Sequence, residues 1–209
     1  MKKIMIYGDS YSTYKGYIPD GYACYYTGER PTPPDLDSMA ETWWGKLIAD
    51  MGYELIENNS WSGSTIGYTG YSGDCSHTSS FIYRLRCHKE RGFFAENKPD
   101  TVFVFGGTND SWSNAPLGEA KQEGISEDDL FSVLPAISHF IGALRETLPD
   151  AEIVVIANCD IKSEIVEALR TAAEKYSATY VKLAGVDKVN GHPTKQGMTD
   201  IKEQIKALL

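Results

Sequence analysis

Residues 2–10 of the chain, KKIMIYGDS, hold the pattern that decides the fold. Residues 2–7 form an apolar run with the length of a β-strand, and Gly8 ends it. Comparable runs recur further along the chain, at residues 53–57, 101–105, 152–157 and 179–183. The sequence therefore predicts five strands, the first of which leads directly into Asp9 and Ser10.

Helical periodicity fills the intervals between the predicted strands. The predicted helices are residues 42–51, 80–91, 132–148, 163–176 and a final helix that follows Pro193. Alternation of strand and helix favours right-handed βαβ units, which build a parallel sheet covered by helices on both faces. We therefore predict an α/β three-layer sandwich whose five-stranded parallel sheet has the flavodoxin-like order 2-1-3-4-5. The functional site should lie beyond the carboxyl ends of its strands.

The composition limits the classes of protein and partner. With 209 residues, of which 42% are hydrophobic and 23% charged, the chain has the size and composition of one globular domain spanning residues 1–209. The net charge of −9 disfavours nucleic acid and anionic membranes as partners. A small molecule or a glycan is therefore the expected partner.

The ends of the chain and its cysteines add two further expectations. No apolar stretch reaches the roughly 18 residues that span a bilayer, and the first three residues run into a strand without a signal-peptide pattern. We therefore expect a cytoplasmic protein, with export as the alternative if the natural chain is longer. The four cysteines form no CxxC pair and no metal-ligand spacing with the histidines, so we expect neither metal nor cofactor.

Polar segments follow the first three predicted strands. Gly8-Asp9-Ser10 presents a hydroxyl in a tight turn, residues 58–65 place Gly63 where its backbone can approach a bound oxygen, and residues 106–110 offer the amide of Asn109. Each segment is short enough to be an ordinary turn or helix cap when it is taken alone. A fourth feature, His192 before Pro193, precedes the last helix, and a lone histidine is more often structural than catalytic.

The four features together indicate a functional site more specifically than any one of them, because the first three strands are neighbours in the proposed sheet and their carboxyl ends meet at one edge. In this order, from Ser10 to His192, they resemble the SGNH/GDSL family of serine esterases and lipases. The resemblance implies that Ser10 is the nucleophile and that His192 is its general base. It also implies an oxyanion hole formed by the backbone N–H groups of Ser10 and Gly63 and the side chain of Asn109. A serine needs such a base, and its tetrahedral intermediate needs such fixed donors.

The chain departs from this family at the position of the third triad residue. Family members commonly carry an aspartate three residues before the histidine, which orients the imidazole and stabilises its charged form. Here that residue is Val189. Either Asp187 replaces the missing acid, or a backbone carbonyl orients the ring and leaves a Ser-His dyad; we favour the dyad.

Two long segments and the tryptophans bear on the substrate. Residues 11–40, rich in tyrosine and proline, and residues 63–79 are too long for minimal connections, and loops of this kind are usually functional or mobile. Aromatic faces near the cleft would suit stacking on sugars or acyl groups, although packing in the core and the loops is the simpler role for tryptophans; these residues are Trp43, Trp44, Trp61 and Trp112. Asp9 and Asp110 would make the surroundings of the nucleophile acidic, which disfavours an anionic substrate.

The expected activity is therefore hydrolysis of a small ester, with an O-acetyl group on a carbohydrate as the preferred substrate. A lipase or thioesterase of the same family is one alternative, and it would need an apolar acyl groove. A flavin-binding module is another, because hydroxyl side chains follow the first strand as they do in phosphate-binding loops. A catalytically inactive, glycan-binding relative is a third, motivated by Val189 at the acid position.

Overall fold

The computed structural model describes residues 1–30 and 34–209. Five of its strands form one parallel sheet in the order β2-β1-β5-β6-β7. Counted consecutively along the chain this order is 2-1-3-4-5, so the predicted fold class and strand order are confirmed. The strands are β1 (Lys3–Gly8), β2 (Glu54–Ser60), β5 (Thr101–Phe105), β6 (Glu152–Ala157) and β7 (Thr179–Lys182).

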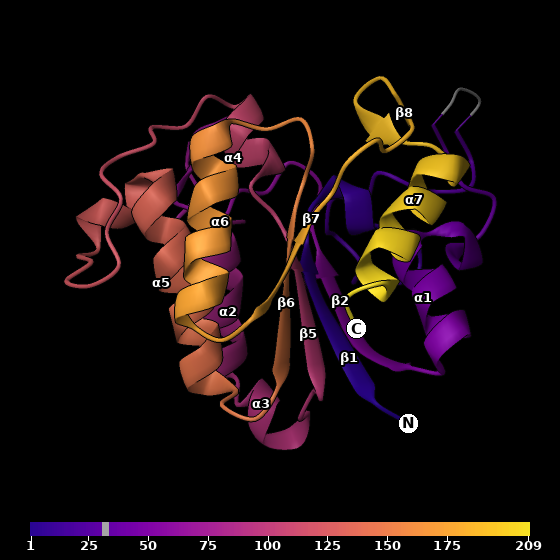
Figure 1. Ribbon diagram of the computed structural model, residues 1–209, viewed down its shortest axis with the longest axis horizontal. Coiled ribbons are helices and arrows are strands. Elements are labelled where there is room, and N and C mark those ends of the chain that lie inside the picture. The colour runs from indigo at the N-terminus through magenta and orange to yellow at the C-terminus, as the bar shows by residue number, and fades with distance from the viewer. Residues whose placement is uncertain (31–33) are drawn as a thin grey trace.

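Helices cover both faces of this sheet, as Figure 1 shows. Helices α1 and α7 pack on one face, and α2, α5 and α6 pack on the other. Each face has its own apolar core, because side chains of a strand alternate between the two sides. The helices are α1 (Trp43–Met51), α2 (Phe81–Glu90), α5 (Val133–Thr147), α6 (Ser163–Lys175) and α7 (Lys195–Lys206).

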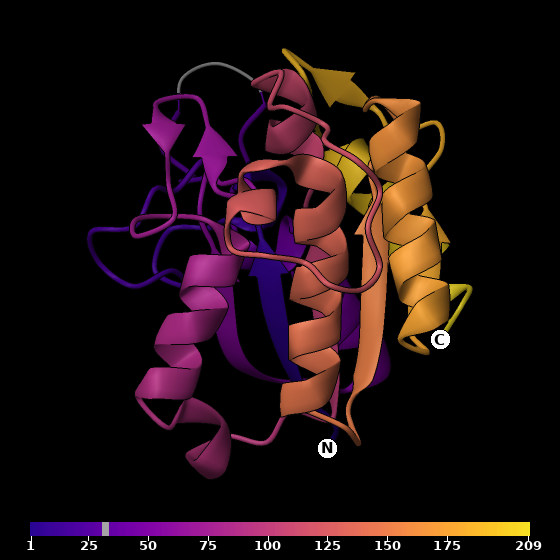
Figure 2. The same cartoon turned by 90° about the vertical axis from the view of Figure 1, so that its left-hand side faces the viewer.

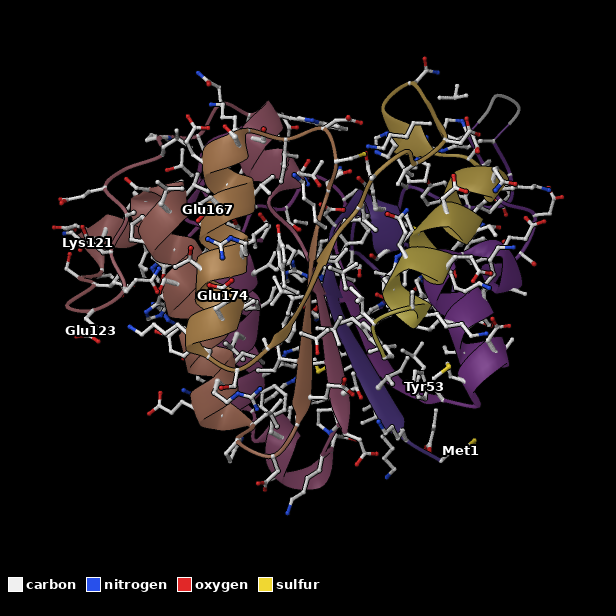
Figure 3. The ribbon with its side chains drawn as sticks, in the orientation of Figure 1. Met1, Tyr53, Lys121, Glu123, Glu167 and Glu174 are labelled. Carbon is white, nitrogen blue, oxygen red and sulfur yellow. The ribbon has the colours of Figure 1, made fainter. Side chains whose placement is uncertain are left out.

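Smaller elements lie between these. Two antiparallel hairpins, β3 (Thr69–Gly70) with β4 (Gly73–Asp74) and β8 (Lys188–Val189) with β9 (His192–Pro193), stand above the carboxyl end of the sheet (Figure 2). Met1 and Tyr53 lie at the opposite end, where the strands begin (Figure 3). The short helices are α3 (Phe93–Glu96), α4 (Thr108–Trp112) and the 3₁₀ turns Ser10–Ser12, Met39–Glu41 and Asp128–Phe131.

The second strand is longer than its apolar pattern predicted. The prediction ended it at residue 57, whereas β2 continues to Ser60. Asn58 and Asn59 remain in register with Ile6 and Tyr7 of β1, although both are polar. Tertiary hydrogen bonds explain this: the Asn58 amide donates to the carbonyl of Ser12, and Arg84 donates to the carbonyl and side-chain oxygen of Asn59. Buried polar groups with such partners are compatible with a strand.

The two long segments, residues 11–40 and 63–79, contain local structure and buried side chains. Residues 63–79 contain the β3–β4 hairpin. In the segment 11–40, Tyr11 and Tyr26 are fully buried, and the amides of Tyr25 and Tyr26 donate to the hydroxyl of Thr13. Packing of tyrosines against the core therefore holds much of this segment; Pro31, Thr32 and Pro33 lie outside the described residues.

Within the described chain, all four cysteines are free and no cluster of three metal-binding side chains occurs. None of the described helices combines the length and apolar character that crossing a bilayer requires. On the outer face of α6, Glu167 and Glu174, both labelled in Figure 3, form ion pairs with Arg170.

Candidate active site

Ser10 lies in a 3₁₀ turn that begins directly after β1. The carboxylate of Asp9 caps this turn by accepting the amide hydrogen of Tyr11 at 3.0 Å. The turn can approach β2 closely because residue 8 is glycine: a Cβ there would lie 2.4 Å from the Ser60 hydroxyl oxygen. The local sequence therefore presents Ser10 at the carboxyl end of the central strands, as predicted.

His192 is carried by the hairpin β8–β9. Its two-residue turn consists of Asn190 and Gly191, both with positive φ (51° and 78°), which is the typical sequence and conformation of a tight hairpin turn. The hairpin places the His192 Nε2 atom 2.9 Å from the Ser10 hydroxyl oxygen. The structure thus brings together two side chains that lie 182 positions apart in the sequence.

The imidazole of His192 has no carboxylate partner among the described residues. Its Nδ1 lies 3.3 Å from the carbonyl oxygen of Asn190, and the ring of Tyr25 stacks on it with a centroid distance of 3.7 Å and an interplanar angle of 4°. Burial lowers the pKa of His192 below its ordinary value; the Asn190 carbonyl opposes this shift, and the positive charges of Arg30 and Lys188 add to it. The ring is therefore neutral at pH 7, the state that accepts a proton.

The three N–H donors predicted for the oxyanion hole come from separate elements, namely the turn after β1, the loop after β2 and helix α4. Among residues 1–30 and 34–209, the backbone N–H groups of Ser10 and Gly63 donate no hydrogen bond. The Asn109 amide nitrogen, at the start of α4, donates one hydrogen to the Ser64 carbonyl at 2.9 Å, and its oxygen accepts from the Tyr71 hydroxyl at 3.3 Å. Because an amide carries two N–H groups, one remains for a ligand.

A buried guanidinium ties these elements together. Arg84, on α2, is 2% exposed and donates to the Gly8 carbonyl at 3.2 Å, to the Ser64 hydroxyl at 3.1 Å and to the Asn59 carbonyl at 2.5 Å. Burial lowers the pKa of Arg84 to about 9, so the group remains a cation at neutral pH. One side chain thus fixes the ends of β1 and β2 relative to the loop that contains Gly63.

The arrangement has the parts that acyl transfer requires. A neutral imidazole faces a hydroxyl at hydrogen-bond distance, which is the geometry of base-assisted nucleophilic attack. A developing oxyanion needs fixed N–H donors, and the amides of Ser10 and Gly63 have no other acceptor among the described residues. Comparison with known proteins gives the same class. The family model for GDSL-like lipase/acylhydrolase matches residues 2–209. The chain belongs to this family.

Solved structures agree with membership in the GDSL-like family. A candidate GDSL-like lipase of Bacteroides ovatus is 38% identical, with a TM-score of 0.89, and the match covers 99% of this chain and 97% of that one. Another, of Bacteroides uniformis, is 36% identical, with a TM-score of 0.88, and the match covers 99% and 94% of the two chains. A search of curated proteins found no match.

More distant structures share the fold only. An acetyl xylan esterase of the rumen bacterium Butyrivibrio proteoclasticus is 19% identical, with a TM-score of 0.60, and the match covers 99% of this chain and 63% of that one. Relatives at this identity establish the α/β architecture of GDSL-like hydrolases and nothing about the substrate of this chain.

Asp187, the carboxylate considered as a replacement acid, does not contact His192 in this GDSL-like hydrolase. Its side chain accepts a hydrogen bond from the Thr194 hydroxyl, and its backbone carbonyl accepts the Thr194 amide at 3.1 Å. Asp187 therefore connects the hairpin to the start of α7. Within the described chain, the hydrogen-bond partner of Nδ1 is the Asn190 carbonyl, the arrangement expected for a dyad.

The surroundings of Gly63 and of the tryptophans bear on the roles predicted for these residues. A Cβ at position 63 would meet no protein atom within 4 Å, so contacts with the surrounding protein do not require glycine there. The positive φ of 81° is the structural reason for glycine at this position. Of the four tryptophans, Trp43 and Trp44 at the start of α1 are fully buried in the core between this helix and the sheet, so they offer no face to the cleft. Trp112 does lie near the nucleophile, with its ring centroid 6.0 Å from that of His192.

The surroundings of Ser10 are also less acidic than expected. Burial raises the pKa of Asp9 to about 7, against the opposing hydrogen bond from the Tyr11 amide. Burial likewise raises the pKa of Asp110 to about 6, although the amides of Ile66 and Gly67 donate to its carboxylate. Both carboxyl groups are completely buried; Asp9 is only partly ionised near neutral pH, whereas Asp110 remains mostly ionised there.

Sequence reasoning missed several residues of the site. It treated the tyrosines after Ser10 as one aromatic group, although Tyr25 contacts His192 and the hydroxyl of Tyr11 donates to the Gly191 carbonyl. No local pattern distinguishes these tyrosines from their neighbours. One signal was available: Asn190-Gly191 predicts a tight hairpin, and that hairpin pairs Val189 directly with His192.

Proposed function

We propose that the protein is a serine esterase that removes small acyl groups, above all acetyl, from the hydroxyl groups of a carbohydrate. Ser10 forms the acyl-enzyme and His192 is the general base. The observation that carries the proposal is the 2.9 Å contact between Ser10 Oγ and His192 Nε2. The N–H groups of Ser10 and Gly63, which have no acceptor among residues 1–30 and 34–209, add to it. In this proposal His192 activates the nucleophile and these N–H groups bind the oxyanion.

In the first half of the reaction, the neutral imidazole removes the proton of the Ser10 hydroxyl through Nε2 as the oxygen attacks the ester carbonyl. Nδ1 then carries the hydrogen that faces the Asn190 carbonyl. The oxyanion receives hydrogen bonds from the amides of Ser10 and Gly63 and from Asn109. The imidazolium next protonates the leaving alcohol, and an acyl-Ser10 ester remains.

In the second half, water takes the place of the leaving alcohol. His192 removes a proton from this water, which attacks the acyl carbonyl, and the same donors bind the second oxyanion. Collapse of this intermediate returns the proton to Ser10 and releases the carboxylic acid. Among residues 1–30 and 34–209 no carboxylate contacts the imidazole, so the hydrogen bond to the Asn190 carbonyl stabilises the imidazolium in this proposal.

The polar lining beside the oxyanion loop favours a hydrophilic substrate. A cavity of about 320 Å³ adjoins Gly63 and is formed largely by hydroxyl side chains and glycines, including Ser62, Thr65 and Ser79. Tyr71 and Trp112 present partly exposed rings near the site, which suits stacking on a sugar ring. Several proteins that share the fold are carbohydrate esterases, and this proposal extends their substrate class to the present chain.

A chain-length profile tests the acyl specificity. With nitrophenyl esters, we expect kcat/KM to be highest for acetate and to fall about tenfold or more by butyrate, because the lining of the cavity beside Gly63 is largely polar. Release of acetate from acetylated xylan or cellulose fragments should accompany it. A preference for butyrate or longer chains would identify a lipase or thioesterase instead, the alternative activity within the family.

Asn109→Ala is expected to lower kcat by about 10² to 10³-fold with little change in KM, since removal of one oxyanion donor has this effect. Steady-state kinetics on nitrophenyl acetate measures it. The matched control is Asn97→Ala, after α3 at the far end of the sheet, where the amide donates only to the Phe93 carbonyl. Equal activity of the two variants would contradict the role of Asn109.

The pH dependence should report His192. Its pKa is lowered from the model-peptide value of 6.5, and the general base must be neutral, so activity is lost as pH falls through the His192 pKa. We expect kcat/KM to follow one protonation with a midpoint below 6.5 and to be constant from there to about pH 8. A midpoint above 7 would show that a carboxylate stabilises the imidazolium after all.

A further inference from the structure

We infer that three tyrosines, Tyr11, Tyr25 and Tyr26, orient His192 in the place of a triad carboxylate, with Tyr25 as the central positioning residue. This inference deepens the proposed function and rests on it. The three residues belong to the segment that follows Ser10, whereas His192 lies near the other end of the chain. We call this group the tyrosine cradle.

A catalytic imidazole needs a defined ring plane as well as a defined position. A triad carboxylate supplies the plane by accepting the Nδ1 hydrogen, and in this chain Val189 cannot. The Asn190 carbonyl accepts at 3.3 Å, near the long limit for such a bond. One long hydrogen bond leaves the ring free to rock about its bond to Cβ, so a second restraint is required.

The stack on Tyr25 supplies this restraint. At a centroid distance of 3.7 Å and an angle of 4°, the two ring planes are in van der Waals contact and parallel. Rotation of the imidazole out of this plane would drive its edge into the phenol ring, so only a half-turn flip remains open. The flipped ring would point carbon, not Nδ1, at the Asn190 carbonyl. Stack and hydrogen bond together therefore select the orientation that aims Nε2 at Ser10.

The other two tyrosines hold the backbone on both sides of the histidine. The Tyr11 hydroxyl donates to the Gly191 carbonyl at 2.5 Å, and the Tyr26 hydroxyl donates to the Pro193 carbonyl at 2.7 Å. Both rings are completely buried, so neither hydroxyl can exchange its partner freely with water. These bonds fix the Cα position of His192, while Tyr25 fixes its ring.

One hydroxyl group joins the cradle to the nucleophile. Thr13 Oγ1 donates to the Ser10 carbonyl at 3.1 Å and accepts the Tyr25 amide hydrogen at 2.7 Å. Thr13 is fully buried. The positions of Ser10 and Tyr25 therefore depend on the same side chain, that of Thr13. Tyr25, which restrains the imidazole, is thus held in a fixed position relative to Ser10, whose hydroxyl the imidazole must deprotonate.

Arg30 holds the far side of the Tyr25 ring. Its guanidinium carbon lies 4.0 Å from the ring centroid, within the range of a cation–π contact. The His192 ring lies 3.7 Å from the same centroid, and two groups this close must occupy opposite faces. The order is thus Arg30, Tyr25, His192, and the cation prevents the phenol ring from moving away from the imidazole.

Three variants test the role of Tyr25 on nitrophenyl acetate. Tyr25→Leu keeps apolar bulk but removes the flat face, and we expect kcat to fall about 10 to 10²-fold while KM stays within about threefold. Tyr25→Phe keeps the face and should retain kcat within about threefold of wild type. Tyr17→Leu is the matched control, since Tyr17 contacts Tyr14 and Trp44 and should leave kcat unchanged.

An aspartate at position 189 tests whether Tyr25→Leu lowers kcat by disturbing the orientation of His192 or by destabilising the fold. Val189 and His192 are directly opposed in the β8–β9 hairpin, so their side chains lie on the same face, and a carboxylate at position 189 can reach the imidazole. We expect Val189→Asp to raise kcat about tenfold in the Tyr25→Leu background and less than threefold in the wild-type background. A destabilised fold would not be repaired by this change.

The outcomes distinguish failure of the inference from failure of the proposed function. Wild-type turnover that Ser10→Ala does not remove would overturn both. If turnover depends on Ser10 but Tyr25→Leu keeps wild-type kcat, only the cradle is wrong. The cradle is equally wrong if Tyr25→Phe loses as much kcat as Tyr25→Leu, or if Val189→Asp gives no gain in the Tyr25→Leu background.

Discussion

Ser10→Ala is expected to lower ester turnover by about 10⁴-fold or more, to the level left by binding and oxyanion stabilisation alone. No other hydroxyl is positioned to replace this nucleophile: among the described residues, the Ser10 oxygen is the one that faces His192 Nε2. The variant should also resist a fluorophosphonate probe, which forms a covalent bond to an activated serine. Mass spectrometry of the labelled wild type should place the adduct on Ser10.

The matched control for this variant is Ser113→Ala. The Ser113 hydroxyl is buried and has no hydrogen-bond partner within the described chain. Ser113 is the C-cap residue of α4, the helix that also contains Asn109. Its loss should therefore change neither labelling nor kcat by more than about twofold. Full turnover by Ser10→Ala would refute the proposed mechanism at its first step.

His192→Phe is the second change for which we expect a loss of about 10⁴-fold or more in kcat. Phenylalanine can retain the stack on Tyr25, so the fold and the shape of the site should survive, but it cannot accept the Ser10 proton. The residual turnover should lose the decline below pH 6.5 that His192 causes and should instead rise with hydroxide concentration.

His77→Phe serves as the control for the histidine, because His77 is exposed and contacts only Tyr83 among the aromatic residues described. Steady-state kinetics and the rate of probe labelling should both distinguish the two variants. Retention of the acid decline in His192→Phe would mean that another group is the general base.

The fold was largely predictable because its strongest signals are local. Apolar runs of strand length separated by amphipathic helices require a covered parallel sheet, and strand order followed from the alternation. The end of β2 was not predictable, because Asn58 and Asn59 are unfavourable in a strand until Arg84 and Ser12 provide partners. The hairpins above the sheet are two residues per strand, too short for a periodic pattern.

The sequence by itself determined the sheet, its order and the four segments that carry Ser10, Gly63, Asn109 and His192. These follow from residue type and spacing, which are local properties of the sequence and do not depend on tertiary contacts. Tertiary structure alone decided what supports His192. Tyr25 and His192 lie near opposite ends of the chain, and their rings come into contact only when the strands that separate them in the sequence have formed the sheet. Tertiary structure also places the Asp187 carboxylate on the Thr194 hydroxyl and buries Asp9. Asp187, the acid closest to His192 in the sequence, and Asp9, the acid next to Ser10, therefore do not contact the imidazole.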